Sequence, residues 1–292
     1  MFHVPLTFYF DFERVSETAR PFIMHEFKSC GAEHLVLSDA LFSLIFSDPT
    51  LIETLMKEVE DAGLTFVDAH APFGKFTDLI CPLPEYREQL VMRQQMAIRI
   101  AAQMGVDTVT VHGGNDTLWP GLTQEQGRAN IIAALERILS TAEECGVTVC
   151  LENTWRCCVL PDALLEIKKH FPTDAFGFCY DSGHANICAK GGDFQNSRGW
   201  ESWKFFGIQP QWEEHTLEKM LPHIVNCHLH DNDGILDQHR IPGCGNVDWR
   251  HELTLLRKAP RLKNIQCEVI PVRVNDSISD ICRKFRELGE LD

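Results

Sequence analysis

Residues 176–186 read FGFCYDSGHAN, an apolar strand-like run that ends on a carboxylate, Asp181, with His184 three residues later. The same pattern recurs along the chain, with His, Asp or Glu at or just after the end of a short apolar run. It occurs in 64–74 (LTFVDAHAPFG, His70), 109–115 (VTVHGGN, His112), 147–155 (VTVCLENTW, Glu152), 224–245 (IVNCHLHDNDGILDQHRIPGCG, His228, Asp237 and His239) and 265–270 (IQCEVI, Glu268). In α/β barrels the loops after the strands converge on one mouth, where active sites are built. The recurrence therefore predicts a metal-binding site at the mouth of a barrel.

Around these segments the chain alternates β-rich runs with helical ones. Runs typical of strands lie at 5–10, 34–37, 64–69, 108–112, 147–152, 176–181, 224–229 and 264–269. Helix signals separate them, such as Thr123 with Gln126 as a capping box for a helix that reaches Cys145. Eight βα units in series predict an α/β fold, a single (β/α)8 TIM barrel over residues 1–292 with a long loop after the sixth strand. A doubly wound open sheet is the alternative, but no Gly-rich dinucleotide fingerprint follows the first run.

The long loop covers residues 189–212 (AKGGDFQNSRGWESWKFFGIQPQW) and holds Trp200, Trp203 and Trp212. It is longer than an ordinary βα loop. One interpretation is a lid or rim that presents flat apolar faces to a substrate or a neighbouring subunit, and the other is a loop packed on itself. An exposed tryptophan rim would favour a homodimer or a larger assembly.

Charge and composition disfavour several kinds of partner. Lys and Arg total 27 against 42 Asp and Glu, a net charge of −15, and no dense basic cluster is present, which disfavours nucleic acid. No apolar run approaches the length of a membrane span, and the first 15 residues lack the basic region of a signal peptide, so we expect a cytoplasmic protein that does not enter the membrane. Several of the twelve cysteines lie inside apolar strand runs and no CxxC pair occurs, which indicates reduced thiols.

Four of the recurring residues follow the last four strands: Glu152, Asp181, His228 and Glu268. Three carboxylates and one imidazole form a hard, mostly oxygen site that suits Mn²⁺, Co²⁺, Mg²⁺ or Zn²⁺. The others, His70, His112, His184, Asp237 and His239, could hold further metals or bind substrate hydroxyls. For His70 and His112, contact with the substrate or with the ligands is favoured over metal ligation.

The motifs LENT (151–154), YDSGHAN (180–186), HLHD (228–231) and DQHRIPGCGNVDW (237–249) resemble those of the xylose isomerase-like TIM-barrel superfamily. This superfamily includes sugar isomerases and epimerases, ketose 3-epimerases, inosose-processing enzymes and AP endonucleases of the endonuclease IV type. The resemblance covers roughly residues 64–270. It implies one divalent metal ion, usually Mn²⁺ or Co²⁺, held by Glu152, Asp181, His228 and Glu268. It also implies proton transfer by Glu152 and Glu268, and substrate-oxygen binding by His184 and Arg240.

The sequence thus predicts a metal-dependent isomerase or epimerase of a small-molecule sugar, sugar phosphate or inosose, acting through a metal-chelated enediolate. Two alternatives stay open: a metal-dependent lyase or dehydratase on a sugar, and a zinc-dependent AP endonuclease or phosphodiesterase. The endonuclease IV type binds three zinc ions, and the ligand types match it in order at His70, His112, Glu152, Asp181, His184, His228, Asp237, His239 and Glu268. A non-catalytic sugar-binding barrel is disfavoured, because binding alone does not call for two candidate bases beside a metal.

Overall fold

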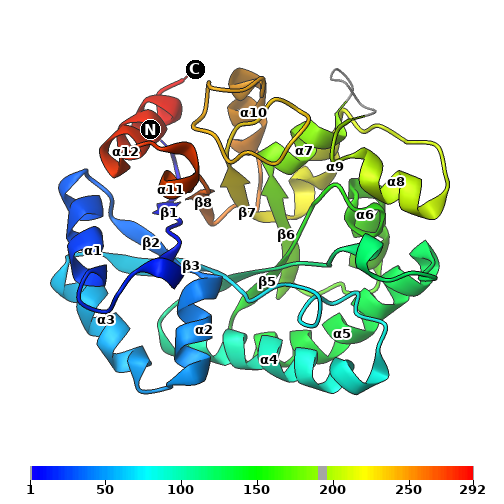
Figure 1. Ribbon diagram of the computed structural model, residues 1–292, viewed down its shortest axis with the longest axis horizontal. Helices are drawn as coiled ribbons and strands as arrows, with labels where there is room; N and C mark the ends of the chain where they lie inside the picture. The colour runs from blue at the N-terminus through cyan, green and yellow to red at the C-terminus, as the bar shows by residue number, and fades with distance from the viewer. Residues whose placement is uncertain (1, 190–195, 292) are drawn as a thin grey trace.

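Eight parallel strands close into a barrel. The computed structural model describes residues 2–189 and 196–291, and Figure 1 shows the strands at the centre with helices around them. The strands are β1 (Leu6–Phe8), β2 (His34–Leu37), β3 (Thr65–His70), β4 (Thr108–Val111), β5 (Thr148–Glu152), β6 (Phe176–Asp181), β7 (Ile224–Leu229) and β8 (Asn264–Cys267). Each strand pairs with the next, and β8 pairs with β1. The predicted (β/α)8 barrel is confirmed, and the open-sheet alternative is wrong.

Helices follow the strands and cover the outside of the barrel (Figure 1). They are α1 (Arg20–Ser29), α2 (Asp39–Ser47), α3 (Leu51–Asp61), α4 (Pro84–Gln103), α5 (Gln124–Cys145), α6 (Pro161–Lys169), α7 (Ser182–Cys188), α8 (Trp200–Phe206), α9 (Thr216–Met220), α10 (Trp249–Leu256), α11 (Pro271–Val274) and α12 (Ile278–Gly289). Short 3-10 turns lie at η1 (Phe12–Arg14), η2 (Asp116–Leu118), η3 (Cys157–Val159) and η4 (Leu221–His223). One apolar core joins strands to helices, for example Leu151 and Phe178 of the barrel with Ile138 of α5.

Local signals in the sequence explain several element ends. Thr123 accepts a hydrogen bond from the Gln126 N–H, and the Gln126 side chain accepts one from the Thr123 N–H, so the predicted capping box of α5 is present. Gly146 ends the same helix in the left-handed conformation at φ 68°. The largest difference is at β1, where the apolar run 5–10 pairs with its neighbours over Leu6–Phe8 before the chain turns into η1.

The long segment after β6 is partly helical. Residues 190–195, which belong to the predicted lid or self-packed loop, lie outside the described residues. In the described part, Trp200 of α8 packs edge-on against Trp212, with 6.1 Å between ring centroids. Ser202 of α8 donates a hydrogen bond to the buried carboxylate of Asp116 in η2. This part of the segment therefore packs on itself and on the loop after β4.

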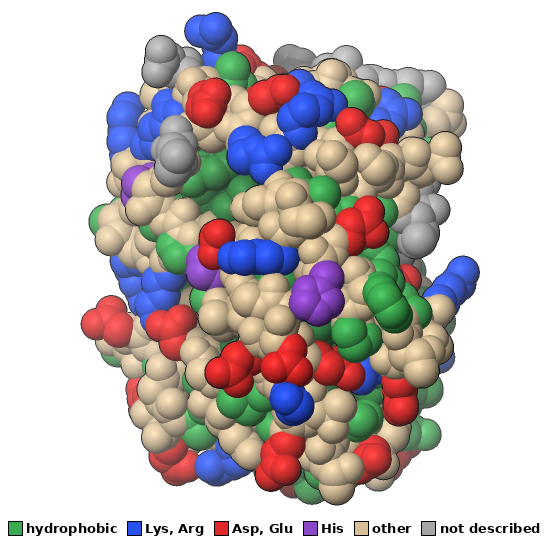
Figure 2. All heavy atoms as spheres, turned by 90° about the vertical axis from the view of Figure 1, so that its left-hand side faces the viewer, with side chains coloured by type: hydrophobic (Ala, Val, Ile, Leu, Met, Phe, Trp, Pro, Cys, Tyr) green, Lys and Arg blue, Asp and Glu red, His purple; other side chains and the backbone are tan. Residues whose placement is uncertain are grey.

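The surface carries charges of both signs. Figure 2 shows acidic and basic side chains interspersed on the face at the left-hand side of Figure 1, with no continuous basic stripe across it. Among the described residues, no helix is long and apolar enough to cross a membrane. All twelve cysteines are free, including the adjacent Cys157 and Cys158.

Glu252 on α10 is an acid whose replacement should stabilise the barrel. Its Oε2 atom is buried without a hydrogen-bond partner among the described residues. Burial raises the pKa of Glu252 to about 8, although a hydrogen bond with Tyr180 opposes the shift. Because the unfolded pKa is about 4.3, the neutral acid favours the folded state, and this contribution is lost as pH rises from about 4 to about 8.

We therefore expect Glu252→Gln to be more stable than wild type at pH 8, by about 4 kcal/mol, and to differ from wild type by only about 1 kcal/mol at pH 5. Urea denaturation at both pH values measures the difference. Glu144→Gln, at a glutamate whose side chain is 60% exposed on α5, is the control and should change neither value. A Glu252→Gln protein that is less stable than wild type at pH 8 would contradict the prediction.

Candidate metal centre

Four predicted ligands meet at the mouth of the barrel. Glu152 and Asp181 end β5 and β6, His228 stands one residue before the end of β7, and Glu268 follows β8. Parallel pairing sets Asp181 beside His228. All four residues are buried, and one ligand atom of each lies within 4.8 Å of the others. The structure thus brings together the four residues that the sequence predicts as a metal site.

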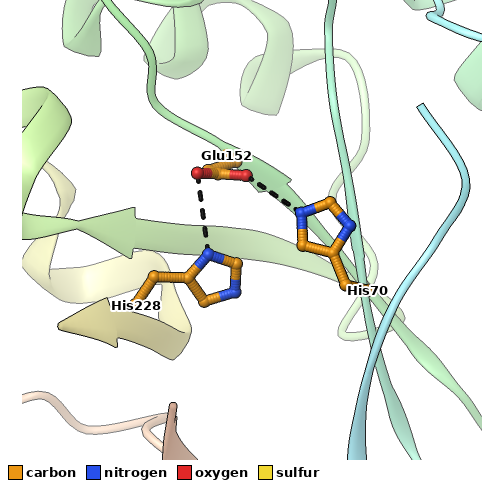
Figure 3. Close-up of side chains that lie close together, drawn as sticks. All are labelled: His70, Glu152 and His228. Atoms are coloured by element: carbon orange, nitrogen blue, oxygen red, sulfur yellow. Dashed lines mark ion pairs between the residues drawn. The ribbon is translucent and has the colours of Figure 1, made fainter. Parts of the chain in front are cut away.

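Two histidines outside this group, His70 and His112, also approach Glu152. Nε2 of His70, at the end of β3, lies 3.7 Å from Oε2 of Glu152, and Nδ1 of His228 lies 3.6 Å from Oε1 (Figure 3). His112, after β4, is closer, with Nε2 2.8 Å from Oε2 of Glu152. Nδ1 of His70 donates to the carbonyl of Ala71 at 3.0 Å, so Nε2 faces the carboxylate and carries the lone pair when the ring is neutral. A cation between Nε2 of His70 and the Glu152 carboxylate could be bound by both.

His184, Asp237 and His239 form a second group. Oδ1 of Asp237 lies 3.7 Å from Nε2 of His184, and its Oδ2 lies 3.1 Å from Nε2 of His239. Nδ1 of His184 donates to the carbonyl of Asn153 at 2.9 Å, and Nδ1 of His239 to that of Glu268 at 2.8 Å. His239 has a φ of 48°, a conformation that is uncommon outside glycine and that often occurs at functional sites. Both rings are therefore anchored through Nδ1 and present Nε2 to the carboxylate.

His230 belongs to the cluster, although our sequence analysis did not single it out. It follows His228 by two residues, which places both side chains on one face of an extended chain. Its Nε2 lies 3.2 Å from Oδ2 of Asp181, and its ring stacks on that of His239 with centroids 4.0 Å apart. A Cβ atom on Gly183 would lie 2.0 Å from Cε1 of His230, which explains the glycine of the DSGHAN motif. The two-residue spacing in HLHD was the signal that could have identified it.

The cluster opens into a cavity of about 390 Å³. The predicted residues that line it are His70, His112, Glu152, His184, Asp237, His239 and Glu268. Arg240, predicted to bind substrate, lies outside this lining, and its guanidinium donates to the carbonyl of Cys244 at 3.2 Å. Arg156 and Arg198 line the cavity instead. Sequence reasoning missed these two arginines, because neither stands at a strand end or in a metal-ligand pattern.

Attraction between opposite charges in the cluster outweighs the cost of burying them. Burial raises the pKa of Glu152, but His112 and His228 hold it well below its usual value. Burial lowers the pKa of His239, yet the neighbouring Asp237 carboxylate raises it to about 9. Glu152 is therefore ionised at neutral pH, and the imidazolium protons of histidines such as His239 balance the negative charge. A divalent cation can replace those protons, because metal binding releases protons from its ligands.

The donor atoms fit a divalent metal ion. Nδ1 of His228, Oδ1 of Asp237 and Oε2 of Glu268 are buried and have no hydrogen-bond partner among the residues that the structure describes. Buried polar atoms are normally paired, so each unpaired atom calls for a ligand. Imidazole nitrogens and carboxylate oxygens are the groups that bind Mn²⁺, Co²⁺ and Zn²⁺ in proteins.

A buried polar network inside the barrel orients His228. Nε2 of His228 lies 3.4 Å from the Thr110 hydroxyl, which accepts a hydrogen bond from the Asn226 amide at 3.0 Å. The same amide donates to both carboxylate oxygens of Asp68 at 3.1 Å. When Nε2 donates to Thr110, Nδ1 carries the lone pair that faces Glu152 and Glu268. Such partners of a ligand raise metal affinity by fixing the ring.

Thr110→Val is accordingly expected to weaken metal binding about 10- to 100-fold, because the variant loses the acceptor for Nε2 of His228. Competition with a chromophoric chelator measures the affinity. Thr7→Val is a matched control, since Thr7 is also a buried barrel threonine but its hydroxyl donates to the backbone carbonyl of Ile265. Equal metal affinities of the two variants would refute a role for Thr110.

Comparison with known proteins identifies a family whose members resemble this chain over most of its length. Residues 28–276 match the family described as xylose isomerase-like TIM barrel. An uncharacterized protein of Methanocaldococcus jannaschii is 28% identical over 248 residues, which cover 83% of this chain and 77% of that protein.

Solved structures agree with this assignment. A D-tagatose 3-epimerase-like protein has a TM-score of 0.72 at 20% identity, with 97% of this chain and 96% of that chain covered. A xylose isomerase-like TIM barrel protein from Mycobacterium smegmatis, solved in complex with magnesium, has a TM-score of 0.71 at 14% identity, with 100% and 98% covered. At these identities the likeness establishes the fold. Because the family match spans most of its length, the chain belongs to the xylose isomerase-like TIM barrel family.

Proposed function

We propose that this protein is a divalent-metal-dependent isomerase or epimerase of a small sugar. The observation that carries the proposal is the placement of Glu152 and Glu268. Nδ1 of His228 lies 3.6 Å from Oε1 of Glu152 and 3.4 Å from Oε1 of Glu268, and both carboxylates line the cavity. Two carboxylates beside one metal-ligand set can act on neighbouring atoms of a single bound sugar.

The metal would be held by Glu152, Asp181, His228 and Glu268, and Mn²⁺ is the ion we expect, with Co²⁺, Mg²⁺ or Zn²⁺ as alternatives. A divalent ion there supplies Lewis acidity, which stabilises negative charge that develops on the sugar oxygens. Solved relatives support a metal of this class, since one was crystallised with magnesium.

In the proposed reaction one glutamate takes a proton from the carbon next to the sugar carbonyl, and the enediolate forms. The carboxylate of Glu152 is ionised and can act as the base. For epimerisation, Glu268 takes up a proton from solvent and delivers it to the opposite face of the same carbon, and Glu152 releases to solvent the proton that it removed. For aldose–ketose exchange, one glutamate moves the proton between two adjacent carbons. His184 and His239, which line the cavity, would bind sugar hydroxyls or the carbonyl oxygen.

Deuterium exchange tests this proposal. Proton NMR follows deuterium entry from D₂O into ketoses, inososes and their phosphates in the presence of the Mn²⁺-loaded protein. We expect exchange at one carbon: C3 indicates a 3-epimerase, and C1 or C2 an aldose–ketose isomerase. Deoxy-sugar signals from loss of water would instead indicate a dehydratase. No exchange with any sugar would refute the proposal.

The second candidate is zinc-dependent cleavage of phosphodiesters. It is favoured because the cluster contains more than one set of side chains whose ligand atoms are close enough to share a metal ion. These sets include His70 with Glu152 and His228, and Asp181 with His184 and His230. Several zinc ions clamped side by side are suited to phosphate-ester hydrolysis. The net charge of −15 argues against a nucleic-acid substrate. Incubation of the zinc-loaded protein with an oligonucleotide that contains an abasic site distinguishes the two functions.

A further inference from the structure

Trp155, Arg156 and Arg198 line one side of the cavity, and we call them the arginine wall. The Trp155 ring meets His184 edge-on at 4.9 Å between centroids, so the wall adjoins the metal-ligand cluster. The guanidinium carbons of Arg156 and Arg198 lie 5.1 Å and 5.8 Å from the centroid of the same indole. Two cations are thus held over one aromatic ring, next to the site of the proposed chemistry.

The two guanidiniums share one carboxylate. Nη2 of Arg156 lies 2.9 Å from Oε2 of Glu201, and Nη1 of Arg198 lies 3.7 Å from Oε1. The Glu201 side chain is 40% exposed, so water weakens its ion pairs with the two arginines. Asp116 is a second acid near Arg156, but its oxygens already accept hydrogen bonds from the Ser202 hydroxyl and the Cys157 N–H. The wall therefore has unused capacity for a further anion.

Two buried donors in the wall have no acceptor. Nη1 of Arg156 and Nε1 of Trp155 are buried without a hydrogen-bond partner in the described part of the chain. Arg156 is 5% exposed, so water does not solvate its guanidinium freely. Both groups donate and cannot accept, so a ligand that pairs them must carry acceptors. Guanidinium forks match the oxygens of phosphate and carboxylate groups in particular.

We propose that the arginine wall binds an oxyanion of the substrate. The sugar would carry a phosphate or a carboxylate at the end away from the carbons that face Glu152 and Glu268. This inference rests on the proposed function, whose substrate it narrows to anionic sugars. The cavity of about 390 Å³ lies in the range of small-molecule sites.

Calorimetric titration of the Mn²⁺-loaded protein tests the inference with three sugars that share a ketose frame. D-fructose is neutral, D-fructose 6-phosphate carries a phosphate, and D-fructuronate carries a carboxylate. Because the metal is common to all three, the difference in affinity reports on the charged group. We expect at least one charged sugar to bind roughly tenfold or more tighter than fructose, and the tighter of the two identifies the oxyanion.

Arg198→Ala and Glu201→Gln should change this preference for charged sugars in opposite directions. Arg198→Ala should remove most of it, whereas Arg137→Ala should leave it unchanged. The side chains of Arg198 and Arg137 are 46% and 47% exposed, which makes them a matched pair. Glu201→Gln removes the carboxylate that competes for both guanidiniums, so charged sugars should bind tighter to it than to wild type.

Equal affinities for the three sugars, or no measurable binding of either charged sugar, would overturn the inference. Equal losses in Arg198→Ala and Arg137→Ala would also do so. Deuterium exchange into the same sugars, measured on the same samples, tests the isomerase activity independently of oxyanion binding by the arginine wall. If a neutral ketose exchanges as fast as its charged counterparts and binds as well, the isomerase proposal stands and the arginine wall has another role. If charged sugars bind through the wall but no sugar exchanges, the wall stands and the isomerase proposal fails.

Discussion

Glu152→Gln is expected to slow deuterium exchange into the substrate by at least about 1000-fold while the barrel stays folded. Glutamine has nearly the shape of glutamate, but its amide cannot accept a proton and is a weaker metal ligand. Glu152 lies within ion-pair distance of His112 at 2.8 Å and of His184 at 3.1 Å, so its charge is also a counterion in the cluster. The NMR exchange assay measures the loss, and Glu268→Gln should show a similar one.

Metal content and circular dichroism are measured on the same samples, so that loss of the base can be told from loss of the metal or of the fold. Glu144→Gln changes an exposed glutamate of α5 and should keep full activity. A Glu152→Gln or Glu268→Gln protein that exchanges near the wild-type rate would show that the carboxylate is not a base. For an isomerase that uses a single base, the two variants should differ, and the more impaired one identifies it.

Removal of the metal with a chelator is expected to abolish exchange and to lower the thermal midpoint of unfolding. An ion that binds the folded state and not the unfolded state adds about 2.7 kcal/mol of stability at a concentration 100 times its dissociation constant. The effect should be large here, because the cluster keeps buried unpaired atoms such as Oδ1 of Asp237 and Oε2 of Glu268. Mn²⁺ added after dialysis should restore both activity and midpoint.

Asp181→Asn provides the comparison for the metal experiment. It removes one proposed ligand charge, so its unfolding midpoint should respond weakly to chelator and to added Mn²⁺. Full exchange activity in wild-type protein shown by elemental analysis to be metal-free would contradict a metal-dependent mechanism. An equal response of both proteins would show that the stabilising ion binds elsewhere.

The clustering of the proposed metal ligands was predictable, because a residue's place within a βα unit of a parallel barrel determines where it lies in space. A residue at the end of a strand must reach the mouth, whatever its distance along the chain from the other ligands. Glu152, Asp181, His228 and Glu268 follow this rule, and the structure brings them together. His230, which our sequence analysis did not single out, follows the rule as well, because it comes directly after β7 and lies on the same face of the extended chain as His228.

Side chains on the loops were less predictable, because the path of a loop depends on contacts made far along the chain. Arg240 forms an isolated antiparallel bridge with Asp231, and this turn directs its guanidinium to Cys244 and away from the cavity lining. Arg198 reaches the cavity because its N–H donates to the carbonyl of Ile235, in the loop after β7. Neither contact is encoded in a local period or motif, so sequence reasoning did not identify Arg198 as a residue of the cavity lining.

The distribution of the ligands around the barrel has a mechanical consequence. Three of the proposed metal ligands lie in β5, β6 and β7, and the fourth, Glu268, directly follows β8. On the other side of the barrel, β1 pairs with its neighbours only over Leu6–Phe8. A bound ion would therefore cross-link one half of the ring and leave the other half held by its own hydrogen bonds. Amide hydrogens in β5 to β8 would then exchange with solvent more slowly once metal is bound. Amide hydrogens where β1 pairs with β2 and β8 would keep the exchange rate that they have without metal. Loading the ion would make the two halves of a nearly symmetric barrel unequal in stiffness.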